Sequence, residues 1–206
     1  MGKHFYNLVW TLTRPLYDVI YPRRVTGLEY LPAEGGFILC LNHISARDPL
    51  FVSSRIPRRR RIFFLAKKEL FKNPQSRWAV SHLGGIPVDR GHADLSAIRR
   101  AMQVLREGFG LGIFPQGTRS RDNSRTPMLN GAAMIALRGG VPVIPAYIDG
   151  PYRCFRHVDI HFGMPIDLSD LARRLDSEAL STATQRISDA IWGLSNTKLT
   201  SKTINK

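Results

Sequence analysis

A histidine and an aspartate five positions apart have the residue types and the spacing of a general-base pair. His43 follows a short, wholly apolar run at residues 37–41, and Asp48 falls in the first turn of the helix expected next. That turn brings the Asp48 carboxylate back towards the imidazole, where it accepts a hydrogen bond from one ring nitrogen and leaves the other free as a base. The carboxylate also stabilises the imidazolium after proton transfer. The alternative for this pair alone is a capping aspartate beside an incidental histidine.

A second polar segment, Gly117-Thr118-Arg119-Ser120, has the residue types of a phosphate site. Glycine allows the backbone to approach a ligand closely, and hydroxyl and guanidinium groups suit a phosphate. Arg90, after a Gly-Gly turn on a separate segment, could supply a second cation to the same phosphate. The alternative for the segment alone is a basic turn. Neither glycine-rich stretch ends in G-K-[ST], which argues against a nucleotide triphosphatase.

Other common kinds of reactive centre have no counterpart in the sequence. A G-x-S-x-G nucleophile elbow is absent, so the base is expected to activate a hydroxyl of the substrate. The two cysteines, Cys40 and Cys154, have no metal-ligand spacing and cannot form a disulfide framework. We therefore expect neither a metal nor a cofactor.

Short apolar runs alternating with helical patterns predict the elements that position these residues. The expected buried strands cover residues 37–41, 62–66, 111–114 and 141–146. Helical spacing of apolar residues recurs over 95–109, 131–136 and 183–194. This alternation predicts a single α/β domain over residues 25–195, with a largely parallel central sheet flanked by helices, followed by a polar tail at 196–206. Ligands bind beyond the carboxyl ends of strands in such sheets, which is where His43 and Gly117 fall.

Residues 1–24 predict an amphipathic helical segment ahead of the domain. Its apolar residues recur at helical spacing: Phe5, Leu8, Val9, Leu12, Leu16, Val19 and Ile20. Pro15 is expected to kink or split this helix. Aromatic and basic residues beside the apolar ones suit a helix lying in a lipid headgroup region, while a helix that caps the core is the alternative.

The charge favours a polyanionic partner. Lys and Arg number 30 against 16 Asp and Glu, which gives a net charge of +14. Nucleic acid is not expected, because aromatic residues are not interleaved with the arginine run at 58–61 and no helix-turn-helix or zinc pattern is visible. That run has three interpretations: a solvated face, a patch for anionic lipid, or a surface for a phosphorylated or acidic substrate. Without a signal peptide or a long apolar run, we expect a cytoplasmic protein, peripheral on the inner face of an anionic membrane, with no transmembrane helix.

Four sequence blocks occur together in a characteristic order. They are NHISARDP at residues 42–49, GIPVDR at 85–90, FPQGTRS at 114–120 and VPVIP at 141–145. In content and order they resemble the 1-acyl-glycerol-3-phosphate acyltransferase family. The resemblance covers about residues 25–165 and implies an acyltransferase that works at a membrane surface. It implies transfer of a fatty acyl group from acyl-CoA or acyl-carrier protein to the sn-2 hydroxyl of lysophosphatidic acid, giving phosphatidic acid.

The resemblance also implies roles for single residues. His43 is the general base, and Asp48 orients and polarises it. The acceptor phosphate is held by Arg90, Gly117, Thr118 and Arg119. Supporting positions are Asn42, Ser45 and Gln116, with Pro145 on the strand linked to the acyl-binding side.

Two positions depart from the family pattern. Gln116 stands where the family usually has Glu, and Leu129 where it commonly has Lys. The first change removes a negative charge but keeps hydrogen bonding, and the second removes a cation near the expected phosphate site. Alternatives therefore stay open: the acceptor is glycerol 3-phosphate, another lysophospholipid or a lyso-aminolipid, or the protein is a non-catalytic membrane-binding relative.

Overall fold

The computed structural model describes residues 3–22, 24–89, 94–120, 123–172 and 174–196. Within them, seven strands form one sheet in the order β1-β7-β6-β2-β5-β3-β4. The strands are β1 (Val25–Thr26), β2 (Phe37–Leu41), β3 (Ile62–Lys67), β4 (Gly85–Val88), β5 (Gly110–Ile113), β6 (Val143–Asp149) and β7 (Asp159–Phe162). All neighbouring strands are parallel except β6 and β7. The predicted α/β class and largely parallel sheet are confirmed.

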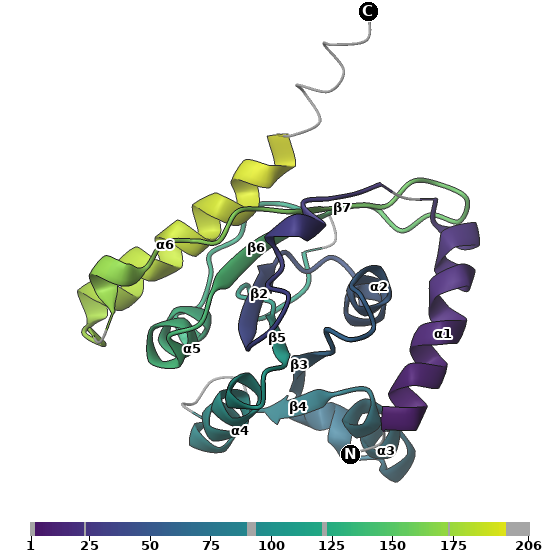
Figure 1. Cartoon of the computed structure of the whole chain (residues 1–206), viewed down its shortest axis with the longest axis horizontal. Coiled ribbons are helices and arrows are strands. Elements are labelled where there is room, and N and C mark those ends of the chain that lie inside the picture. Colours follow the sequence, from purple (N-terminus) through teal and green to yellow (C-terminus); the bar gives the residue numbers. More distant parts are fainter. Residues whose placement is uncertain (1–2, 23, 90–93, 121–122, 173, 197–206) are drawn as a thin grey trace, which may run out of the picture.

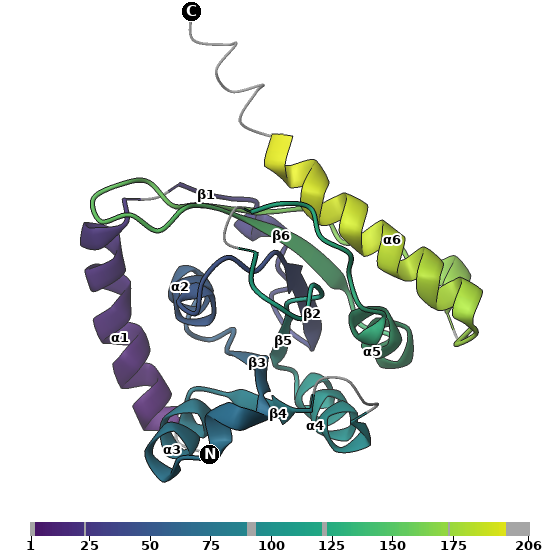
Figure 2. The ribbon, with the colours of Figure 1, turned by 180° about the vertical axis from the view of Figure 1, so that it is seen from behind.

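Helices cover both faces of the sheet. They are α1 (Lys3–Ile20), α2 (Asp48–Arg55), α3 (Pro74–His82), α4 (Leu95–Arg106), α5 (Gly131–Gly139) and α6 (Ser177–Gly193). Figures 1 and 2 show α4, α5 and α6 on one side of the sheet and α2 on the other, with α1 outside α2. Helix α3 lies at the start of α1, where the rings of Phe5 and Trp78 are 4.6 Å apart.

Strand β2 lies in the middle of the core because its side chains are apolar on both faces. All five of its residues are fully buried. Ile38 and Cys40 join the apolar cluster under α4, α5 and α6, while Phe37, Leu39 and Leu41 join the cluster under α2. Side chains of a strand alternate between the two faces, so a continuous apolar run is what burial on both faces requires.

The elements that the sequence analysis did not predict lie mostly at the sheet edges. Strands β1 and β4 are the two edge strands, β7 is the antiparallel neighbour of β6, and helix α3 precedes β4. Strand β4 contains Gly85 and Pro87, which weaken a strand pattern. An edge strand tolerates proline because one side of its backbone has no partner strand.

Helix α1 is one continuous helix and is not split at Pro15. One face packs on the domain: Tyr6 and Tyr21 are 5% exposed, and Trp10 Nε1 donates to the Ser53 carbonyl at 3.0 Å. An ion pair between Asp18 and Arg55 joins the helix to α2 beyond the proline. These contacts on both sides of Pro15 hold the helix together despite the missing backbone donor.

A second face of α1 is apolar and exposed. Its side chains, each more than half exposed, are those of Leu8, Leu12, Leu16 and Val19, which we call the α1 stripe. The helix therefore covers the core with one face and presents apolar surface with another. None of the described helices is both long and apolar enough to cross a membrane.

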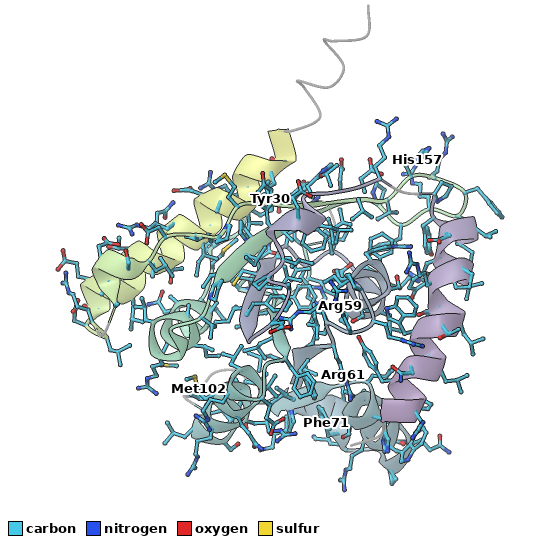
Figure 3. All side chains as sticks on the ribbon, in the orientation of Figure 1. Tyr30, Arg59, Arg61, Phe71, Met102 and His157 are labelled. Carbon is cyan, nitrogen blue, oxygen red and sulfur yellow. The ribbon has the colours of Figure 1, made fainter. Side chains whose placement is uncertain are left out.

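Only two of the four arginines at residues 58–61 lie at the protein surface. Arg58 and Arg59 are exposed, but Arg60 and Arg61 are buried (Figure 3 labels Arg59 and Arg61). Arg61 donates to the His82 carbonyl at 2.9 Å and lies over the rings of Tyr6 and Phe63. The run precedes Ile62, which is level in the sheet with the start of β2. It therefore lies at the opposite edge of the sheet from His43, which follows the end of β2.

Candidate active site

His43 and Asp48 form a close pair at the carboxyl end of β2. His43 Nδ1 lies 2.7 Å from Asp48 Oδ2. The same oxygen accepts from the backbone N–H groups of Ile44 at 2.8 Å and Ser45 at 2.9 Å. The Asp48 carboxylate is completely buried, at the first residue of α2. Asp48 thus holds the turn before α2 and the imidazole at the same time.

The hydrogen bonds of Asp48 determine the state of the imidazole. A carboxylate only accepts, so His43 Nδ1 must carry the proton. Nε2 is then the basic nitrogen, and it has no hydrogen bond to any residue that the structure describes. The ring is stacked on Phe114, with centroids 4.0 Å apart and an angle of 21° between the planes. Both contacts fix the ring with Nε2 available to a substrate.

Asn42 and Gln116 fix the backbone around the histidine. The buried Asn42 amide accepts from Ile148 N–H at 2.7 Å and donates to the Ile148 carbonyl and to Asn123 Oδ1. Gln116 Oε1 accepts from His43 N–H at 2.8 Å, and its Nε2 donates to Thr126 Oγ1 at 2.6 Å. The two amides join β2 to β6 and to the segment after β5. Gln116 acts through two neutral hydrogen bonds, and neither of them needs a carboxylate.

An apolar cavity of about 490 Å³ opens beside His43. Its walls come from α1, α2, α3 and the carboxyl half of β3. Apolar lining residues include Val9, Trp10, Leu50, Phe64, Leu65 and Val80. Helix α1 forms one wall with a different face from the α1 stripe. A cavity of this size and lining can hold a flexible hydrocarbon chain next to the imidazole.

Polar groups gather at the same cavity. Thr118, Arg119 and Lys67 line it together with His43, and the Lys67 ammonium also contacts Glu69 at 3.2 Å. Gly117 precedes them in a left-handed conformation, with φ of 67°. A side chain at Gly117 would be strained there and would meet Leu129, with 2.6 Å between its Cβ and Leu129 Cδ1. Thr118 and Arg119, two of the residues expected to bind the phosphate, thus lie on the same cavity as His43.

The remaining predicted residues lie in different places. Arg90 is outside the described residues. Ser45 contributes its backbone N–H to Asp48, and its hydroxyl accepts from Arg47 N–H at 3.2 Å. Pro145, in β6, is opposite Cys40 of β2, and Pro145 is not among the residues that line the cavity.

The sequence analysis missed three residues of the site. Lys67 was not singled out, although it ends β3, where ligands are expected. Phe114 was read only as the end of a strand. Asn123, which bonds to Asn42 and Tyr147, has a backbone φ of 57° in a polar loop. No local pattern marks such a long-range contact.

The described residues thus combine a mostly parallel sheet covered by helices on both faces, an imidazole oriented by a buried carboxylate, and an apolar cavity beside it. Comparison with known proteins identifies the family. Residues 22–149 match the family model described as Acyltransferase. The chain belongs to this acyltransferase family.

Relatives and a solved structure agree with this assignment. The 1-acyl-sn-glycerol-3-phosphate acyltransferase of Bacillus subtilis is 33% identical over 84% of this chain and 88% of its own length. The protein of the same name from Streptococcus pneumoniae is 32% identical over 73% of this chain and 57% of its own. The crystal structure of the 1-acyl-sn-glycerophosphate (LPA) acyltransferase PlsC from Thermotoga maritima matches with a TM-score of 0.72 and 26% identity, over 94% of this chain and 79% of that one.

Proposed function

We propose that this acyltransferase moves a fatty acyl group from a thioester to the sn-2 hydroxyl of 1-acyl-sn-glycerol 3-phosphate, giving phosphatidic acid. The observation that carries the proposal is the unbonded Nε2 of His43 beside an apolar cavity that Thr118 and Arg119 also line. The names of the relatives point to the same acceptor. The donor is acyl-CoA or acyl-carrier protein.

The reaction needs one proton acceptor and no protein nucleophile. His43 Nε2 takes the proton of the acceptor hydroxyl as its oxygen attacks the thioester carbonyl. Asp48, bonded to Nδ1, stabilises the imidazolium that forms. The tetrahedral intermediate then collapses, the carbon–sulfur bond breaks, and the thiolate takes the proton back from His43. An ester and a free thiol result, and the base is restored.

The acceptor phosphate binds at the polar end of the site. Arg119 offers a planar fork of donors, and Thr118 offers a hydroxyl, which suits phosphate oxygens. Lys67 lies on the same cavity and adds a point charge. Arg90 joins them by its place in the family pattern. The acyl chain of the donor occupies the apolar cavity, where Leu50 and Phe64 form part of the wall.

The protein works while peripheral on an anionic membrane, at its cytoplasmic face. The α1 stripe supports this, because four exposed apolar side chains on one helix face suit insertion at the headgroup boundary. Phe155 extends the apolar surface: it is 73% exposed, and its N–H donates to the Ile20 carbonyl at the end of α1. Exposed Arg153 and Arg156 flank Phe155 and suit anionic lipid.

The test is an assay of thiol release with purified protein. Acyl-CoA and acyl-carrier protein are each supplied with lysophosphatidic acid, glycerol 3-phosphate, a neutral lysophospholipid or a lyso-aminolipid. We expect thiol release that depends on lysophosphatidic acid, and phosphatidic acid as the product by mass spectrometry. Thiol release with only one of the other acceptors would identify that acceptor as the substrate. No thiol release with any donor and acceptor would favour the non-catalytic interpretation.

A further inference from the structure

Two buried polar atoms at the rear of the His43–Asp48 pair lack a hydrogen-bond partner in the described residues: Asp48 Oδ1 and the Tyr152 hydroxyl. Buried polar atoms are normally paired, so each one calls for an explanation. The two oxygens of Asp48 differ: Oδ2 accepts from three donors, whereas Oδ1 accepts from none of the described residues.

The two unpaired groups interact with each other. The ring of Tyr152 packs on Phe51, three residues after Asp48 in α2, and the Asp48 carboxylate acts electrostatically on the Tyr152 hydroxyl, although no hydrogen bond joins the two in this structure. Burial raises the pKa of the Tyr152 phenol well above its usual range, and the nearby Asp48 charge raises it further, while Arg55 acts in the opposite direction. Tyr152 is therefore protonated and can only donate to a carboxylate oxygen.

The ring of Tyr152 is held by elements on both sides. It lies edge-on to Phe51 of α2, with centroids 5.4 Å apart, and to Tyr21 at the end of α1, with centroids 5.3 Å apart. The loop that carries it follows β6 and packs against the histidine segment, since a Cβ on Gly150 would come within 2.4 Å of Ile44 Cδ1. The ring of Tyr152 is thus held between the end of α1 and the helix α2 whose first residue is Asp48.

We propose that Tyr152 is a positioning residue, which donates a hydrogen bond to Asp48 Oδ1 as the imidazolium forms and thereby holds Oδ2 on His43 Nδ1. This inference rests on the proposed function of His43. A carboxylate held through one oxygen alone can rotate about its Cβ–Cγ bond. A donor on the second oxygen opposes that rotation and keeps water away from the charge. Tyr152 touches no substrate and acts only through Asp48.

The test replaces Tyr152 by Phe, which keeps the ring and removes only the hydroxyl. We expect kcat to fall roughly tenfold, as on loss of one hydrogen bond to a charged group, with the KM of both substrates within about twofold. Thermal melting checks that the variant is folded. The matched control is Tyr30→Phe, a half-exposed tyrosine on the short helix after β1, which should leave kcat unchanged.

A double-mutant cycle separates positioning from packing. Stability to denaturant is measured for Tyr152→Phe, Asp48→Asn and the double variant. We expect Tyr152→Phe to change stability differently in the two backgrounds, because the hydroxyl and the carboxylate interact. Wild-type kcat in Tyr152→Phe, or identical effects in both backgrounds, would overturn the inference. Full activity of His43→Ala would instead overturn the proposed function, and the two failures are therefore distinguishable.

Discussion

At the residue scale, one oxygen of Asp48 links local folding to chemistry. Asp48 Oδ2 closes the turn that starts α2 and at the same time fixes the tautomer of His43. A substitution there affects both the turn and the imidazole, whereas a substitution of His43 removes only the proposed base. The site therefore separates catalytic effects from folding effects more cleanly at position 43 than at position 48.

We predict that His43→Ala lowers kcat by roughly 10² to 10⁴-fold, the contribution of a positioned general base. The fold should persist, because the side chain is not part of either apolar cluster. Acceptor-dependent thiol release measures the rate, and circular dichroism and thermal melting check the fold. Activity near that of the wild type in folded His43→Ala protein would contradict the mechanism.

We predict that Gln116→Glu changes kcat by less than about tenfold, the range set by exchanging one neutral hydrogen bond. A carboxylate can still accept from His43 N–H, and the Thr126 hydroxyl can rotate and donate to its second oxygen. Steady-state kinetics with lysophosphatidic acid and with other acceptors measure the effect. A gain of tenfold or more would show that the carboxylate matters and that this chain is a weakened catalyst.

We predict that Arg119→Ala raises the KM of lysophosphatidic acid by roughly 10 to 150-fold, as expected for loss of a charge-assisted hydrogen bond. The KM of the acyl donor should change much less. Arg138→Ala, an exposed arginine at the end of α5, serves as the control of equal charge change. If only the donor KM rises in Arg119→Ala, then Arg119 binds the donor.

The contact between His43 and Asp48 was predictable from sequence because the two residues are five positions apart and one turn brings them together. The contacts that complete the site were not. Asn42 meets Asn123 across 81 positions, and Gln116 meets Thr126 within a polar loop of irregular backbone. Hydrogen bonds of this kind depend on how segments meet in space, which neither periodicity nor composition encodes.

At the element scale, what could be predicted depended on burial. The strands predicted at 37–41, 62–66, 111–114 and 141–146 correspond to β2, β3, β5 and β6, with ends shifted by up to three residues. Edge strand β1 has only two residues, and β4 contains glycine and proline, so neither has an apolar run to recognise. Tertiary contacts also kept α1 continuous where Pro15 predicted a break.

The N-terminus of α4 gives a prediction about pH. Asp94 caps the helix by accepting from the N–H groups of Ser96 and Ala97, and its other oxygen accepts from Asp89 N–H. These bonds and the Ser96 hydroxyl lower the pKa of Asp94 from 3.8 to about 2. A lowered pKa in the folded state means that the cap stabilises the protein above about pH 4 and that this stabilisation is lost as the pH falls towards 2.

We therefore expect Asp94→Ala to cost about 1 kcal/mol of unfolding free energy at pH 7, the usual contribution of a helix cap. The difference from the wild type should shrink as the pH is lowered from 5 to 2. Urea denaturation at several pH values measures it, with Asp170→Ala, an exposed aspartate paired with Arg186, as the comparison. A difference that stays constant down to pH 2 would exclude an ionised cap.

At the scale of the whole molecule, helix α1 contributes to two different surfaces. One face lines the apolar cavity and another presents the α1 stripe, so a single helix separates the cavity from the surrounding surface. Removing α1 would open the cavity as well as delete the stripe. The membrane role of this helix is therefore best tested by substitutions confined to the exposed face.

We predict that Leu12→Asn weakens binding to anionic vesicles at high salt by roughly tenfold, because an inserted leucine contributes up to about 2 kcal/mol. Attraction between the net charge of +14 and the lipid is screened with a Debye length of about 8 Å at physiological salt, whereas apolar insertion is not. The difference in vesicle binding between Leu12→Asn and the wild type should therefore grow as salt is added. Vesicle co-sedimentation over a salt series measures it.

The matched control is Leu95→Asn, because both leucines are 60% exposed and Leu95 lies on α4, across the sheet from α1. It should bind vesicles like the wild type. Turnover should separate the two variants in the same way: Leu12→Asn should act more slowly on vesicle-borne acceptor but normally on a soluble, short-chain acceptor, since the cavity face of α1 is untouched. Equal binding by both variants at every salt concentration would mean that the α1 stripe is not the membrane contact and that the basic surface alone attracts the protein to lipid.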